Sequence, residues 1–207
     1  MNTDSAVRAV VAFPTFEVAD RQWIESIRAK HDPEAKRIAA HFTLIFPAIL
    51  PFRETESHVA QVARSMEPMR FVLRRATVVP DHLGTAGHVF LLPDDGRDAL
   101  VGLHDRLNQG VPQPHWKRGV SFTPHVTVAA GALDLLDALV GDLNAKGLAI
   151  RGSVSSLVEV GTGLHFAQMG EYLAPPIPGV FHVRMQYTPS VLSDSGPCEA
   201  VVTITVR

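Results

Sequence analysis

The sequence predicts an α+β protein with mainly antiparallel sheet, and three observations carry that prediction. β-rich runs such as "VRAVVAFP" (7–14) and "FVLRRATVV" (71–79) alternate with segments whose apolar residues recur at helical spacing. The elements lack the regular strand–helix–strand rhythm of a doubly wound sheet, and no glycine-rich loop follows the first strand. In each half of the chain, strands and helices lead to a strand that begins with H-x-T, which indicates two equivalent lobes.

Start and stop signals divide the chain into elements. A helix is expected from Asp20, and Asp32-Pro33 is expected to begin a second, short helix before the strand at 41–47. Further amphipathic helices are expected at 54–66, around 100–107 and at 133–143, and further strands at 87–92, 153–161, 180–188 and 199–207. We therefore expect a two-lobed domain over residues 1–160, with residues 161–207 as a C-terminal loop and β-hairpin packed on it.

Composition narrows the class of function. The 207 residues are 46% hydrophobic, which is enough for a sizeable core, and the net charge is −2, which disfavours binding of long duplex nucleic acid. The single cysteine, Cys198, excludes an internal disulfide framework and a cysteine-based zinc site, and it favours a cytoplasmic location. The first apolar run is short and follows an acidic residue, and no stretch approaches membrane-spanning length, so no membrane association is expected.

Two short motifs carry the chemistry. In "HFTLIFP" (41–47) the period-2 geometry of a strand puts His41 and Thr43 on one face, opposite the apolar Phe42. "TPHVTVAAG" (123–131) repeats this arrangement with His125 and Thr127. A lone strand histidine is usually structural, but two matched pairs of imidazole and hydroxyl groups call for a common chemical explanation.

Cleavage of a phosphodiester without metal provides that explanation. With an unperturbed pKa of about 6.5, one imidazole can accept a proton from an attacking water while another donates a proton to the departing ribose oxygen. Threonine hydroxyls on the same face can donate hydrogen bonds to the non-bridging phosphate oxygens. We expect His125 to act as the base and His41 as the acid.

The two motifs and their flanks resemble those of the two-histidine (2H) phosphoesterases, often labelled 2′-5′ RNA ligase-like. "HFTL" and "HVTV" match the paired H-x-T-x motifs of that family, and the similarity extends over roughly residues 7–160. The resemblance implies a bilobal fold with helices outside, in which two antiparallel sheets face each other across a cleft with both motifs at its floor. It also implies action on cyclic phosphodiesters or RNA ends, with neither metal nor cofactor.

One departure from the family concerns the phosphate-binding cation. Many members carry an arginine shortly after the second motif, where this chain has Ala129, Ala130 and Gly131. Either another cation replaces this arginine or the site has none. A nearby aromatic ring can stack on a nucleobase. The candidates for these substrate contacts are Arg74, Arg75, Lys117, Arg118 and Trp116.

The leading hypothesis is therefore a phosphodiesterase that opens the 2′,3′-cyclic phosphate of a nucleotide or an RNA terminus. A 2′-5′ RNA ligase is the second hypothesis, although ligation has to hold two RNA ends and the net charge of −2 disfavours this. A catalytically silent nucleotide- or RNA-binding module is the third, and it is compatible with the missing arginine. His82 and His88 lack further ligands at metal-binding spacing, so no metal site is expected. The sequence leaves the oligomeric state open.

Overall fold

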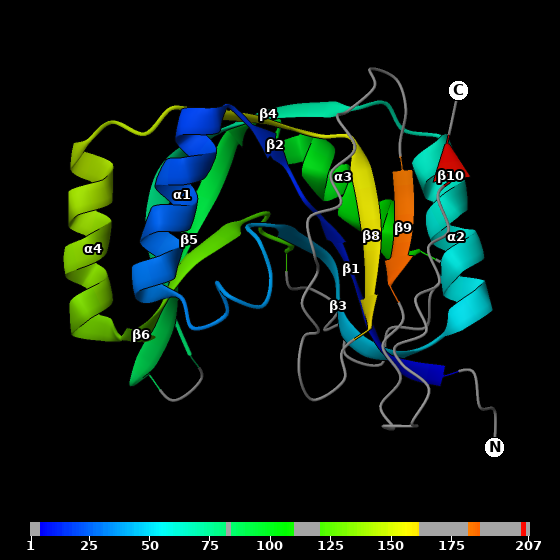
Figure 1. Ribbon diagram of the computed structural model, residues 1–207, viewed down its shortest axis with the longest axis horizontal. Coiled ribbons are helices and arrows are strands. Elements are labelled where there is room, and N and C mark those ends of the chain that lie inside the picture. Colours follow the sequence, from blue (N-terminus) through cyan, green and yellow to red (C-terminus); the bar gives the residue numbers. More distant parts are fainter. Residues whose placement is uncertain (1–4, 82–83, 110–120, 162–181, 187–203, 206–207) are drawn as a thin grey trace.

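Two five-stranded sheets organise the chain in a computed structural model that describes residues 5–81, 84–109, 121–161, 182–186 and 204–205 (Figure 1). Sheet A has the spatial order β10 (Ile204–Thr205), β9 (His182–Gln186), β8 (Ser156–Gly161), β1 (Ser5–Ala12) and β3 (Phe42–Pro51). Sheet B has the order β2 (Thr15–Phe16), β7 (Ile150–Val154), β4 (Met69–Pro80), β5 (Ala86–Asp95) and β6 (Val126–Ala132). Only β8 and β9 pair in parallel among the described strands. The predicted α+β class with mainly antiparallel sheet is confirmed.

Two pairs of helices cover the sheets. The first pair, α1 (Val18–His31) and α4 (Leu133–Ala145), contacts the strands of sheet B. In the second pair, α2 (Phe52–Arg64) contacts sheet A, and α3 (Arg97–Asn108) contacts β3 of sheet A and also β4 and β5 of sheet B. Figure 1 shows α1 and α4 at one end of the molecule and α2 at the other. None of the helices that the structure describes is long and apolar enough to span a membrane.

A shared core joins the two sheets on their helix-bearing sides. Phe42 of sheet A packs edge-on against Phe71 of sheet B, with ring centroids 5.1 Å apart and planes at 89°. A second, smaller cluster lies on the other face of sheet A, where Phe13 packs against Ala9, Val11, Val158 and Val160. Each sheet thus has one face that packs against helices and one face turned away from them.

Three of the expected elements differ from the structure. The helix expected from Asp20 begins at Val18. Residues 33–37 form turns instead of a short helix, and the Asp32 carboxylate accepts the Glu34 N–H (2.9 Å) as in an Asx turn. The single strand expected at 153–161 is two strands, since the chain leaves sheet B at Val154 and joins sheet A at Ser156.

The C-terminal segment contributes to sheet A. Within the two strands expected at 180–188 and 199–207, the structure describes β9 and β10, which pair antiparallel, and β9 extends the sheet beside β8. The domain boundary expected at residue 160 stays a prediction.

Candidate active site

The first motif lies at the start of β3, on the face of sheet A that is turned away from the helices. Thr43 pairs with Val11 of β1, so it projects from the side of the smaller apolar cluster, and His41 precedes it by two residues. The Nδ1 atom of His41 lies 2.9 Å from the carbonyl oxygen of Ala39. The ring of Phe13 is tilted against the imidazole at a centroid distance of 5.9 Å.

The second motif repeats this local geometry at the start of β6. The Nδ1 atom of His125 lies 2.7 Å from the carbonyl oxygen of Thr123, again the residue two positions earlier. A carbonyl oxygen can only accept, so each imidazole carries a proton on Nδ1 and donates it. The Nε2 atom of each ring is therefore the atom left to exchange protons with a substrate.

Both imidazoles have lowered pKa values. Burial lowers the pKa of His41 from 6.5 to about 4, with the nearby positive charges of Arg28 and His125 adding to the effect. Burial also lowers the pKa of His125, and the neighbouring His88 adds to that shift. The influence of His125 on His41 means that the two motifs lie within electrostatic reach of each other.

The register of sheet B identifies the neighbours of the second motif. Phe90 of β5 stands directly between Thr77 of β4 and Thr127 of β6, so these three residues share one face of the sheet. The Phe90 ring stacks on the His125 imidazole, with centroids 3.7 Å apart and planes 16° apart, and His88 stacks on the same ring at 6.0 Å. In the sequence, Phe90 was missed and His88 was considered only as a metal ligand, although "GHVFLLP" places the two residues two apart on a strand.

The predicted cations Arg74 and Arg75 separate in the structure. An irregularity in the pairing of β4 with β5 makes Arg74 the extra residue, and its guanidinium forms an exposed ion pair with Asp95 (3.1 Å). Arg75 pairs with Leu92, on the face that carries Thr77 and Phe90, and continuing the register of β5 and β6 puts His125 opposite Leu92. By this register, Arg75 shares a sheet face with the second motif, and its side chain is exposed.

The other predicted substrate contacts, Trp116, Lys117 and Arg118, lie outside the described residues. In the part of the chain that the structure describes, no three His, Cys, Asp or Glu side chains gather into a group that could hold a metal ion. The candidate site residues that the structure describes are His41, Thr43, His125, Thr127 and Arg75, a set suited to proton transfer and to binding of an anion.

Comparison with known proteins identifies the family of the chain. Residues 16–161 match the 2′-5′ RNA ligase superfamily. The chain belongs to this family. The resemblance to the two-histidine phosphoesterases is thereby confirmed, and the matched segment includes both H-x-T motifs. No curated protein matches the sequence.

Solved structures resemble this chain at low sequence identity. Usb1 from Kluyveromyces marxianus has a TM-score of 0.52 at 12% identity, over 76% of this chain and 95% of its own. Its complex with uridine monophosphate gives 0.53 at 11% identity over the same shares. LigT from E. coli in apo form gives 0.45 at 18% identity, over 78% of this chain and 90% of its own. The likeness to Usb1 supports the fold of this superfamily member.

Proposed function

We propose that this member of the superfamily is a metal-independent phosphodiesterase that opens 2′,3′-cyclic phosphates of nucleotides or RNA ends. The observation that carries the proposal is the pair of histidines, His41 and His125, each with Nδ1 donating to a carbonyl two residues back and Nε2 left for chemistry. One such imidazole can take a proton from the attacking water while the other gives a proton to the departing ribose oxygen. The uridine monophosphate complex of K. marxianus Usb1 is in keeping with a nucleotide ligand.

The pKa values favour acid and base roles for the two histidines opposite to those expected from the sequence. A pKa of about 4 keeps the His41 imidazole neutral at neutral pH, and the neutral form is the one that a general base requires. We therefore assign His41 as the base that takes a proton from the attacking water. His125, once protonated beside the anionic substrate, gives its Nε2 proton to the ribose oxygen as the phosphorus–oxygen bond to that oxygen breaks.

Thr43, Thr127 and Arg75 are the proposed ligands of the phosphate. The two threonines sit two residues after their histidines on the same strand faces, so their hydroxyls can donate to non-bridging oxygens as negative charge develops. Arg75 supplies a positive charge from the neighbouring strands, in place of the arginine that is absent after the second motif. Trp116, Lys117 and Arg118 remain proposed contacts to the rest of the substrate.

The two rival functions predict different products. A 2′-5′ RNA ligase would join RNA ends, and a silent module would bind nucleotides without changing them. The single cysteine, Cys198, favours action in a reducing compartment such as the cytoplasm.

Incubation with 2′,3′-cyclic nucleotides and short RNAs that end in a cyclic phosphate, in excess chelator, tests the proposal. We expect hydrolysis to a monoester, followed by ³¹P NMR or chromatography, and loss of turnover in His41→Ala and His125→Ala. Joined RNA would favour the ligase, and binding without turnover would favour the silent module. Activity that disappears in chelator and returns with a divalent ion would overturn the metal-free mechanism.

A further inference from the structure

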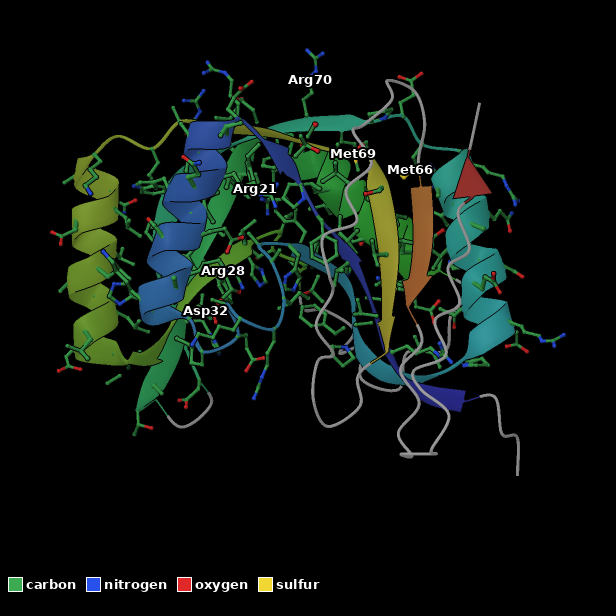
Figure 2. The ribbon with its side chains drawn as sticks, in the orientation of Figure 1. Arg21, Arg28, Asp32, Met66, Met69 and Arg70 are labelled. Carbon is green, nitrogen blue, oxygen red and sulfur yellow. The ribbon has the colours of Figure 1, made fainter. Side chains whose placement is uncertain are left out.

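A buried arginine of α1 is tied to the segment that delivers His41. Arg28 is only 1% exposed, and its guanidinium donates to the carbonyl oxygen of Ile38 at 2.7 Å. Glu25 of α1 and Asp32, the residue that follows the helix, accept from this guanidinium at 2.9–3.0 Å, so its charge is compensated where it is buried. Figure 2 shows Arg28 and Asp32 near the C-terminal end of α1.

Glu25 extends this network to the residue before the histidine. Its carboxylate accepts the backbone N–H of Ala40 at 2.9 Å as well as the Arg28 guanidinium. Ala40 is buried, so its N–H needs such an acceptor. The three residues before His41 are therefore held in place, because Ile38 binds Arg28, Ala39 binds the His41 ring and Ala40 binds Glu25.

The second motif reaches the same imidazole geometry by another route. The position before His125 is Pro124, which has a ring-locked φ angle and no N–H that needs an acceptor. The first motif has Ala39 and Ala40 at the corresponding positions, so the residue before its histidine retains an N–H. The network on α1 thus restrains the backbone before His41, as Pro124 restrains the backbone before His125.

We propose that Glu25 and Arg28 are positioning residues, which orient the His41 imidazole by holding the backbone of residues 38–40. The inference rests on the proposed catalytic role of His41, because only then does the orientation affect turnover. The hydrogen bonds of Glu25 and Arg28, called the clamp below, keep the Ala39 carbonyl aimed at Nδ1 of His41. The neutral ring is therefore protonated on Nδ1 and presents an unprotonated Nε2 to the attacking water. In this way α1, which packs on sheet B, controls a histidine of sheet A.

Glu25→Ala is the main test variant, since the Glu25 side chain is about one third exposed and its removal leaves the pairing of Arg28 with Asp32 intact. We expect kcat to fall by about 10- to 100-fold, because small misplacements of a catalytic group cost that much, while KM changes little. Glu34→Ala is the matched control, because this carboxylate pairs with the exposed Arg37 in the same segment. It should keep wild-type kinetics.

The state of the His41 ring gives a readout that does not depend on activity. Nitrogen-15 NMR of the wild-type imidazole should show the tautomer protonated on Nδ1, and Glu25→Ala should shift the population toward the tautomer protonated on Nε2. If Glu25→Ala is folded and leaves both the tautomer and kcat unchanged, the inference is overturned. If the wild type turns over no cyclic phosphate, the proposed function fails, while the tautomer still decides whether the clamp orients His41.

A second substitution tests whether a proline before His41 can replace the contact between Glu25 and Ala40. Ala40→Pro, which copies Pro124, removes the N–H that Glu25 accepts, so it should restore much of the kcat lost in Glu25→Ala. Absence of any rescue in a folded double variant contradicts the role given to the Ala40 contact. Glu25→Gln retains one acceptor oxygen and should be only mildly impaired, which keeps the question open to measurement if Glu25→Ala does not fold.

Discussion

The ring of Phe90 lies flat against the imidazole of His125, with centroids 3.7 Å apart and planes only 16° apart. This contact covers one side of the histidine with apolar surface, which agrees with burial as the main cause of its lowered pKa. It also leaves the ring little freedom to rotate about its hydrogen bond to the Thr123 carbonyl. Phe90 therefore shapes both the orientation and the basicity of the second motif.

Phe90→Leu should remove the flat support while keeping an apolar side chain on β5. We expect kcat to fall by about tenfold and the pKa of His125 to rise toward 6.5, because the ring gains water and mobility. Phe16→Leu is the control, since Phe16 packs edge-on against Phe71 (5.9 Å, 89°) at the opposite edge of sheet B from the second motif. Steady-state kinetics and an NMR titration of His125 check both variants. Equal effects of the two substitutions would contradict a specific role for Phe90.

The pH dependence of kcat/KM should be bell-shaped with its optimum on the acid side of neutrality. The free enzyme needs neutral His41, whose pKa of about 4 sets the acid limb, and protonated His125, whose pKa below 6.5 sets the alkaline limb. Each limb should disappear from the residual activity of the corresponding alanine variant. The profile of kcat should lie at higher pH, because the bound phosphate anion raises both pKa values. An alkaline limb that persists in His125→Ala would contradict the assignment.

Thr43→Val and Thr127→Val should be folded but impaired, since valine keeps the β-branched shape and loses the hydroxyl. Each lost hydrogen bond to a charged oxygen should cost roughly 1–3 kcal/mol of transition-state stabilisation. Thr→Ser at the same positions restores a donor and should recover most of kcat/KM. Circular dichroism and steady-state kinetics decide the matter, and valine variants with wild-type kinetics would remove the threonines from the mechanism.

Arg75→Ala should lower kcat/KM by about tenfold, while Arg74→Ala should stay within about twofold of wild type. The neighbouring arginines make a matched pair, because Arg75 shares a sheet face with His125 and Arg74 is engaged with the exposed Asp95. Arg75→Lys should recover part of the loss as a point charge. Inhibition by inorganic phosphate provides a second measurement and should weaken only when Arg75 is changed.

Glu159 should make stability depend on pH. It is buried with Arg8, their charged groups 2.9 Å apart, and burial raises the pKa of Glu159 from 4.5 to about 7 despite that pairing. Because the folded state holds this proton more tightly than the unfolded state, the group lowers the free energy of unfolding as pH rises from about 4.5 to 7.

Glu159→Gln should remove that dependence. Relative to wild type, the variant should gain roughly 1–3 kcal/mol between pH 4.5 and 7.5, as measured by urea unfolding at both pH values. The difference between the proteins is the quantity to compare, since the lowered pKa of His41 gives wild type a slope of opposite sign between pH 4 and 6.5. A difference that does not change with pH contradicts the raised pKa.

Much of the candidate site was predictable because the information is local. Side chains two apart on a strand share a face, so the motifs alone paired His41 with Thr43 and His125 with Thr127. The alternation rule could not separate Arg74 from Arg75, because the extra residue in β4 changes which of the two shares a face with the second motif. Nor could it reveal the Phe90 stack, which depends on the register between two strands that are distant in sequence.

By itself, the sequence determined the α+β class, the two H-x-T strands and the family, since periodicity and short motifs are written in neighbouring residues. Only the tertiary structure decided that β7 and β8 belong to different sheets, and that an arginine of α1 holds the backbone before His41. The assignment of β7 and β8 to different sheets depends on which strands bury their apolar faces together, β7 with β4 and β8 with β1. The arginine contact depends on a guanidinium that is stable in the interior only where two carboxylates and a carbonyl oxygen converge on it. Such convergence is a property of the packed chain and has no local signature in the sequence.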